Sequence, residues 1–216
     1  MSNDILEEVA SREIVIPPIG LKAILTIPKQ ASGMVIFAHG SGSGRKSPRN
    51  NYVASALQTD GFATLLLDLL TPDEELDRAN VFDISLLATR LSMAARWVRS
   101  RAGLETMPIG YFGASTGAGA ALVAAARDEP EVAAVVSRGG RPDLAGDWLG
   151  HVRAPTLLIV GSLDGQVIEL NKQAYNALPC PKHMTIIRGA GHLFEEPGTL
   201  EEVIVHASAW FGTYLD

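Results

Sequence analysis

A serine between two glycines is the residue of this sequence best placed for nucleophilic chemistry. It is Ser115, within the segment GASTG at residues 113–117, which fits the pattern Gly-x-Ser-x-Gly. The apolar residues 107–112 before it predict a strand, and the alanine-rich residues 118–126 after it predict a helix. A sharp turn between the two strains the backbone at the serine and crowds the flanking positions, which therefore favour glycine. We interpret Ser115 as a nucleophile.

A serine nucleophile needs a histidine base and a carboxylate that orients this base. His192 ends the segment Gly-Ala-Gly-His directly after a predicted strand at residues 183–187. Asp164 follows a predicted strand at residues 155–160. The chain order Ser115, Asp164, His192 is the order expected of α/β-hydrolases. Asp143 follows the preceding predicted strand and is the alternative acid.

Acyl transfer also needs N–H donors for the oxyanion that forms in the transition state. We assign one to the N–H of Thr116 and the other to the N–H of Ser41, with Gly40 as the alternative. Ser41 lies in the glycine-rich loop at residues 39–44, which follows a predicted strand at residues 34–38. Such a loop before a helix is also typical of phosphate binding, but neither a Gly-Lys-Ser/Thr sequel nor the Gly-x-Gly-x-x-Gly spacing is present.

These residues together resemble those of a small serine hydrolase of the α/β-hydrolase superfamily, similar in layout to dienelactone hydrolase-like proteins. The resemblance covers nearly the whole chain and is carried by residues 39–40, the turn around Ser115, Asp164 and His192. It implies hydrolysis of a carboxylic ester or a related acyl bond without a metal or another cofactor. True dienelactone hydrolases have a cysteine nucleophile where this chain has Ser115.

The 216 residues, of which 47% are hydrophobic, suffice for one α/β-hydrolase domain over residues 1–216. Residues 13–16 and 21–27 predict an N-terminal hairpin. Alternating strand and helix patterns then predict a mainly parallel sheet with helices on both faces and no large lid. The further strands are expected near 62–67 and 132–136, and the further helices near 50–59, 80–100, 144–149, 166–177 and 198–214.

Four arginines lie near the expected mouth of the site: Arg45, Arg49, Arg138 and Arg141. Guanidinium groups bind carboxylate or phosphate with two parallel hydrogen bonds, so these residues are candidates for selecting an anionic substrate. The alternative is that they are solvated loop residues or form ion pairs with nearby aspartates. The rim of the site is expected at residues 68–80 and 137–147.

Charge and composition limit the kinds of partner and the cellular compartment that we expect for this protein. The net charge is −6 without a basic stripe, so nucleic acid is not expected. No apolar run approaches the roughly 18 residues of a membrane helix, and the acidic N-terminus is unlike a secretory signal. The single cysteine, Cys180, excludes an intrachain disulfide and fits a reducing compartment. We expect a cytoplasmic protein that acts on a small-molecule acyl substrate; its oligomeric state is open, and a homodimer is compatible with the sequence.

Three functions fit this pattern. The first is hydrolysis of an ester, lactone or thioester through an acyl-enzyme on Ser115. The second is acyl transfer to an alcohol or amine by the same three residues. The third is binding without catalysis, and the fold alone does not decide among them.

Overall fold

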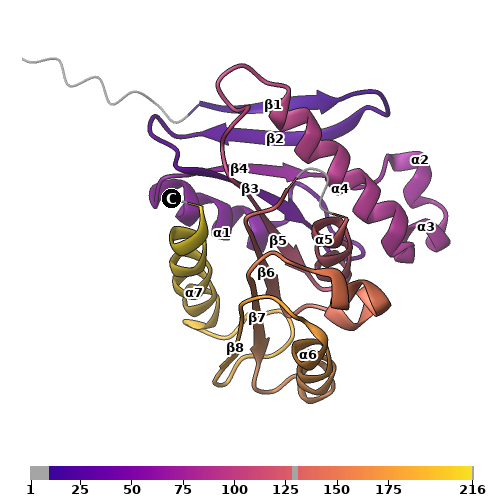
Figure 1. The fold of residues 1–216 in the computed structure, drawn as a ribbon, viewed down its shortest axis with the longest axis vertical. Helices are drawn as coiled ribbons and strands as arrows, with labels where there is room; N and C mark the ends of the chain where they lie inside the picture. The colour runs from indigo at the N-terminus through magenta and orange to yellow at the C-terminus, as the bar shows by residue number, and fades with distance from the viewer. Residues whose placement is uncertain (1–9, 128–130, 216) are drawn as a thin grey trace, which may run out of the picture.

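In the part of the chain that the structure describes, eight strands form one sheet (Figure 1). The computed structural model describes residues 10–127 and 131–215. The strands are β1 (Ala10–Ile16), β2 (Leu21–Ile27), β3 (Gly33–Ala38), β4 (Phe62–Leu67), β5 (Ile109–Ala114), β6 (Ala134–Arg138), β7 (Thr156–Gly161) and β8 (Lys182–Ile187). Their order across the sheet is β1-β2-β4-β3-β5-β6-β7-β8.

The sheet is parallel except at its N-terminal edge. From β4 to β8 across the sheet every neighbouring pair is parallel. Strand β2 is antiparallel to both β1 and β4. The predicted mainly parallel sheet and the N-terminal hairpin are therefore confirmed.

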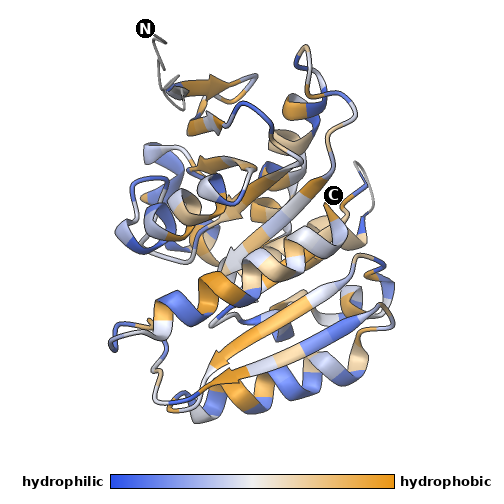
Figure 2. Cartoon of the chain, turned by 90° about the vertical axis from the view of Figure 1, so that its left-hand side faces the viewer, coloured by the Kyte–Doolittle hydropathy of each residue, from blue (hydrophilic) through white to orange (hydrophobic). Residues whose placement is uncertain are grey.

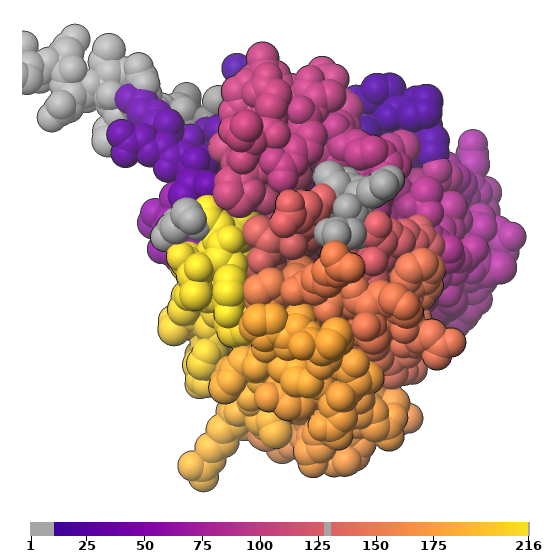
Figure 3. Space-filling model, in the orientation of Figure 1, coloured from indigo at the N-terminus to yellow at the C-terminus, as the bar shows by residue number. Residues whose placement is uncertain are grey.

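Helices cover both faces of this sheet. On one face lie α1 (Pro48–Thr59) and α7 (Thr199–Tyr214), and on the other lie α4 (Ile84–Arg99), α5 (Thr116–Ala126), α6 (Gly165–Ala177) and the 3₁₀ helix η1 (Pro142–His151) (Figure 1). Figure 3 shows the second face, on which the chain runs from α4 at the top to the orange α6 segment at the bottom. On this face neighbouring helices contact each other in the order α4, α5, η1 and α6.

The core has two apolar layers because successive strand residues point to opposite faces. In β3, Met34 and Ile36 belong to the cluster on the side of α4 and α5. Val35 and Phe37 belong to the cluster on the side of α1 and α7. Figure 2 shows hydrophobic residues along the strands and mixed hydrophobic and hydrophilic residues along the helices. A strand that is buried on both faces must be apolar throughout, which explains the continuous apolar runs in the sequence.

The structure corrects one predicted helix. The stretch expected as a single helix near 80–100 is divided into α3 (Arg78–Phe82) and α4, and α2 (Pro72–Glu75) precedes them. The break lies at Asp83, whose backbone is non-helical (φ −77°, ψ 88°) and whose carboxylate accepts a hydrogen bond from Leu86 N–H. Short polar side chains that bond to a nearby backbone N–H begin helices rather than continue them.

The carboxyl ends of the parallel strands bring the predicted site residues to one edge of the sheet. Residues 39–44 follow β3, Ser115 follows β5, Asp164 lies just beyond β7 and His192 lies beyond β8. Arg138 is itself the last residue of β6. Ligands of such sheets bind beyond these strand ends.

Candidate active site

Ser115 has a strained backbone at the junction of β5 and α5. Its φ is 50° and its ψ is −124°, a conformation that residues with a side chain rarely adopt. Three backbone hydrogen bonds hold it there: its N–H donates to Arg138 O (3.5 Å), and its carbonyl oxygen accepts from Ala118 N–H (3.1 Å) and Arg141 N–H (2.9 Å). This geometry places the serine side chain on a sharp turn at the carboxyl end of β5.

Three glycines around Ser115 leave no space for a side chain. A Cβ on Gly117 would lie 2.1 Å from Ala38 O, and one on Gly113 would lie 2.5 Å from the Cα of Ala118. A Cβ on Gly40 would lie 2.9 Å from the Cβ of Ser115. The glycines of the sequence pattern therefore permit the close approach of β3, β5 and α5.

Asp164 and His192 are in direct contact. The Nδ1 of His192 lies 2.6 Å from the Oδ2 of Asp164. Because a carboxylate accepts, Nδ1–H is the donor, and Nε2 is left with its lone pair in the neutral ring. Asp164 is mostly shielded, whereas 39% of the His192 side chain is exposed.

The loops that carry this acid and this histidine are bonded to each other. Leu163 N–H donates to Ala190 O (2.9 Å), and Gly189 N–H donates to Ser162 Oγ (2.8 Å). Within the second loop, Gly191 N–H donates to a carboxylate oxygen of Glu196 (3.0 Å), and this bond lowers the pKa of Glu196. Glu196 is not among the predicted site residues.

Ser115 and His192 line the same cavity, which has a volume of about 270 Å³. Gly40 and Ser41 from the loop after β3 also line it, and so does Arg138. The structure thus brings Ser115, His192 and the glycine-rich loop together, and Asp164 joins them through His192.

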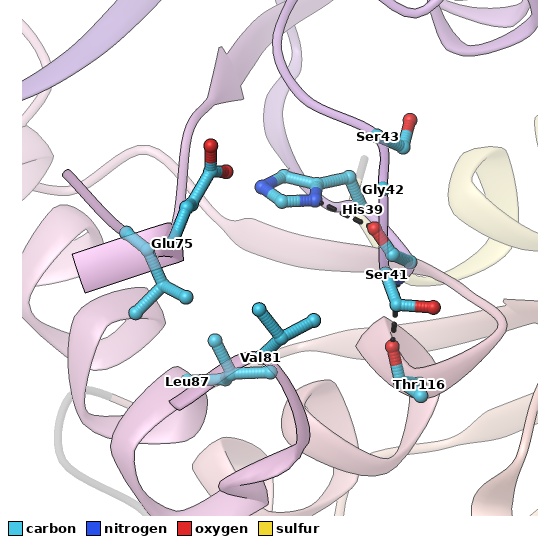
Figure 4. A pocket seen from close by; sticks show the side chains of 10 residues that line it. His39, Ser41, Gly42, Ser43, Glu75, Val81, Leu87 and Thr116 are labelled. Carbon is cyan, nitrogen blue, oxygen red and sulfur yellow. Dashed lines mark hydrogen bonds between the residues drawn. The ribbon is translucent and has the colours of Figure 1, made fainter. Parts of the chain in front are cut away.

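The two predicted oxyanion donors lie in adjoining segments. Thr116 is the first residue of α5, where a backbone N–H has no partner within the helix. The N–H of Ser41 donates to Thr116 Oγ1 at 3.1 Å (Figure 4). In this structure the Ser41 N–H is therefore engaged in a hydrogen bond with a hydroxyl group.

His39 anchors the loop that carries Gly40 and Ser41. Its Nε2 accepts a hydrogen bond from Leu69 N–H (3.0 Å), so Nδ1 carries the proton and donates to Gly40 O (2.9 Å; Figure 4). Burial lowers the pKa of His39, although the bond to Gly40 and the carboxylates of Asp68 and Glu75 oppose this shift. His39 is neutral and has both ring nitrogens bonded.

A second cavity, of about 290 Å³, shares Gly40, Ser41 and Ser43 of the glycine-rich loop with the first (Figure 4). Leu70, Val81 and Leu87 give it apolar walls, and Glu75 and His39 add polar groups. Part of its wall comes from residues 68–80, the segment expected to form the rim.

The predicted arginines have different surroundings. Arg45 forms an ion pair with Asp68, and Arg49 pairs with Glu195 (2.7 Å). Arg141 binds both carboxylate oxygens of Asp143 (2.9 and 2.7 Å). The alternative acid, Asp143, is therefore engaged by Arg141, whereas Asp164 contacts the histidine.

The described residues contain neither a cluster of metal-ligand side chains nor a helix that could span a membrane. No three histidine, cysteine, aspartate or glutamate side chains gather there as metal ligands would. None of the helices in residues 10–127 and 131–215 has the length and hydropathy needed to cross a membrane.

The fold has counterparts among known structures. A dienelactone hydrolase from Anabaena variabilis is 53% identical and superimposes with a TM-score of 0.91 over 97% of this chain and 99% of that chain. Est1E from Butyrivibrio proteoclasticus (16% identical, TM-score 0.78, 94% of this chain and 98% of that one) shares the fold. So does an alpha-beta serine hydrolase homologue from Coxiella burnetii (22% identical, TM-score 0.75, 96% and 99%).

Curated relatives match as well, over part of their length. A protein named "Putative phosphoribosyl transferase", found in two strains of Mycobacterium tuberculosis, is 58% identical over 203 residues, which are 94% of this chain. The chain spans about half (46%) of the length of these relatives. No family model matches the sequence. On the extent and identity of the match to the Anabaena protein, the chain belongs to the α/β-hydrolase superfamily, within which it is dienelactone hydrolase-like.

Proposed function

We propose that this protein is a serine hydrolase that cleaves a carboxylic ester, lactone or thioester through an acyl-enzyme on Ser115. The observation that carries the proposal is the contact between Asp164 and His192 at 2.6 Å, next to a strained serine that lines the same cavity as the histidine. Strain of this kind costs about 1–3 kcal/mol and is concentrated at functional sites. Binding alone has no need of a serine held in this way.

The reaction follows from the arrangement of the groups. As the Ser115 hydroxyl attacks the acyl carbon, Nε2 of His192 takes its proton, and Asp164 stabilises the imidazolium through Nδ1–H. The N–H groups of Thr116 and Ser41 stabilise the oxyanion. His192 then gives the proton to the leaving alcohol or thiol, and a water molecule, deprotonated by the same histidine, releases the acid and restores the serine.

Acyl transfer is the alternative outcome of the same acyl-enzyme. It differs only in the group that attacks the second time, so product analysis in the presence of a competing alcohol or amine separates the two activities. Phosphoribosyl transfer is named only for relatives of which this chain spans 46%. The contacts around Ser115 favour acyl chemistry for this chain.

The experiment that tests the proposal uses a fluorophosphonate, which labels only activated serines. The protein is treated with the probe, and the adduct is mapped by mass spectrometry. We expect stoichiometric labelling at Ser115, none in Ser115→Ala, and a sharp fall in His192→Ala. Absence of labelling in the folded wild-type protein would contradict the proposal and favour a binding role.

A further inference from the structure

Two cavities meet at the glycine-rich loop, and they reach different groups of the proposed reaction. Both are lined by three residues of this loop: Gly40, Ser41 and Ser43. The first cavity is also lined by Ser115 and His192, whereas the second is lined by Thr116, the residue of the other expected oxyanion donor. An ester has an acyl half and an alcohol half, and this division offers each half a cavity of its own.

The direction of proton transfer indicates which half enters which cavity. In the tetrahedral intermediate the acyl carbon carries four groups: the Ser115 oxygen, the oxyanion, the leaving group and the acyl chain. The leaving group faces His192, because Nε2 of this residue gives it the proton. The oxyanion faces the N–H groups of Thr116 and Ser41. The acyl chain therefore takes the remaining direction, past the oxyanion donors and away from the histidine, and the second cavity begins at these donors.

The second cavity has the walls of an apolar binding site. Leu70 and Leu87 are each only 3% exposed, Val81 is half-buried, and all three line the cavity. Figure 4 shows Val81 and Leu87 on one side of it and Ser41 and Thr116 on the other. Its volume of about 290 Å³ is close to the lower end of the range for small-molecule sites, about 300–1,000 Å³. A short apolar chain that enters it leaves water, which is favourable.

The short helix α2 carries one wall of this cavity and is held in place. The carboxylate of Glu74 accepts a hydrogen bond from Arg90 on α4 (2.5 Å), and its backbone carbonyl accepts one from Asn80 (3.0 Å). The next residue, Glu75, lines the cavity (Figure 4). Among the described residues that line it, the charged group is this carboxylate, because His39 is neutral. A carboxylate attracts a positively charged end of an acyl chain and repels a negatively charged one.

We propose that the second cavity binds the acyl half of the substrate, that Val81 and Leu87 limit the length of the chain, and that Glu75 favours a chain that ends in an ammonium group. This inference rests on the proposed function, because it follows from the positions of the nucleophile, the base and the oxyanion donors. The substrate class is an ester or thioester of a medium-length apolar carboxylic acid, and an ω-amino acid is preferred to its unsubstituted counterpart.

Two isomeric esters test the direction of the acyl chain. Ethyl hexanoate and hexyl acetate have the same atoms, but the six-carbon chain is on the acyl side of the first and on the alcohol side of the second. We expect Val81→Phe, which fills the second cavity, to lower the kcat/KM ratio of ethyl hexanoate to hexyl acetate about tenfold or more, the value of one methylene group in an apolar pocket. Leu193 lines the first cavity, so Leu193→Phe is the matched variant and raises this ratio. An unchanged ratio in Val81→Phe, or a lower one in Leu193→Phe, would overturn the inference.

A second pair of esters tests the role of Glu75. Ethyl 6-aminohexanoate and ethyl heptanoate differ in that an ammonium group replaces the terminal methyl group. We expect Glu75→Gln to lower the kcat/KM ratio of the amino ester to the neutral ester about twofold to fivefold, the value of a partly solvated ion pair. Glu202→Gln removes an exposed carboxylate from α7, on the other face of the sheet, and keeps the wild-type ratio. An unchanged ratio in Glu75→Gln, or an equal change in both variants, would reject the role of Glu75.

Binding of an uncleavable acyl analogue separates this inference from the proposed function. We expect hexanamide, followed by ligand-observed NMR titration, to bind the wild type and Leu193→Phe, and to bind Val81→Phe at least fivefold more weakly. Binding that depends on Val81 in a protein that fluorophosphonate does not label would retain the apolar site and reject the hydrolase. Labelling of Ser115 with an unchanged ester ratio in Val81→Phe would retain the hydrolase and reject the acyl site. If Val81→Phe does not fold, Val81→Ala enlarges the cavity and raises the kcat/KM ratio of ethyl octanoate to ethyl hexanoate, and an unchanged ratio rejects the site.

Discussion

The N–H of Ser41 donates to the side-chain hydroxyl of Thr116 at 3.1 Å, across 75 positions of the sequence. This bond joins the loop after β3 to the first residue of α5, the two segments from which oxyanion donors are expected. A hydrogen bond to an ionised oxygen is roughly twice as strong as one to a neutral oxygen. We therefore propose that the hydroxyl keeps the Ser41 amide in place until the oxyanion of the proposed reaction displaces it.

Replacement of the Thr116 hydroxyl tests this positioning role. Thr116→Val keeps the shape of the side chain but removes the acceptor for the Ser41 N–H. We expect the free energy of unfolding to fall by about 1 kcal/mol and kcat/KM for a neutral ester to fall about fivefold to tenfold, mostly in kcat. Thr116→Ser, which keeps the hydroxyl, restores both values. Activity of Thr116→Val above that of the wild type would instead show that the hydroxyl competes with the oxyanion.

The two candidate acids, Asp164 and Asp143, have different partners, so their substitutions have different expected effects. Asp164→Asn removes the negative charge beside His192 Nδ1, so the imidazolium is no longer stabilised and the tautomer is no longer fixed. We expect kcat to fall about a thousandfold or more, with the fold retained in circular dichroism.

Asp143→Asn is the matched control for Asp164→Asn. It breaks the pair with Arg141 and leaves the contact of His192 intact. We expect fluorophosphonate labelling of Ser115 to continue at close to the wild-type rate. Loss of labelling in Asp143→Asn together with normal labelling in Asp164→Asn would reverse the assignment.

Much of this fold is legible in the sequence, because buried parallel strands must be apolar throughout. The expected strand at residues 62–67 coincides with β4, which is buried throughout. The expected strand at residues 183–187 lies within one residue of β8, although this edge strand is half-buried or exposed from Lys182 to Ile186. The sequence pattern does not show the break at Asp83, because the apolar periodicity continues across this residue. The non-helical backbone of Asp83 and its capping bond to Leu86 N–H show that a second helix begins there.

The sequence predicts the candidate site to the extent that each of its residues comes shortly after the end of a predicted strand. Parallel strands place their carboxyl ends at one edge, so the order Ser115, Asp164, His192 already implies proximity. The state of the arginines is not predictable in this way. Arg138 and Arg141 are three positions apart, yet one is buried against Asn50, 88 positions away, and the other is paired locally with Asp143. Only the packed structure shows which guanidinium lacks an acid.

The contact between Gly117 and β3 predicts a large effect of a single methyl group. A Cβ at Gly117 would lie 2.1 Å from Ala38 O, a backbone atom at the carboxyl end of the inner strand β3, so Gly117→Ala forces the strand and α5 apart. We expect a loss of about 3 kcal/mol or more in the free energy of unfolding, or failure to fold. Gly212→Ala in α7 is the control, since its Cβ meets no atom within 4 Å and alanine favours a helix by about 0.5–1 kcal/mol. Chemical denaturation of both variants measures the difference, and equal stability of the two would contradict the predicted clash.

Burial of His39 predicts a specific dependence of stability on pH. Its folded pKa lies below the ordinary value of 6.5, chiefly because burial disfavours the charged ring. As the pH falls through about 6.5, the unfolded chain takes up a proton that the folded protein does not, so the free energy of unfolding decreases, by up to about 1.4 kcal/mol per pH unit. The decrease ends once the pH passes the folded pKa, where protonated Nε2 no longer accepts the bond from Leu69 N–H.

His39→Gln lacks this titration. Urea denaturation between about pH 8 and pH 5 should therefore show the stability advantage of the wild type over His39→Gln narrowing below about pH 6.5. His183→Gln, at an exposed position, controls for the loss of a histidine, and an advantage that stays constant over the whole range would show that His39 is not the group whose burial resists protonation.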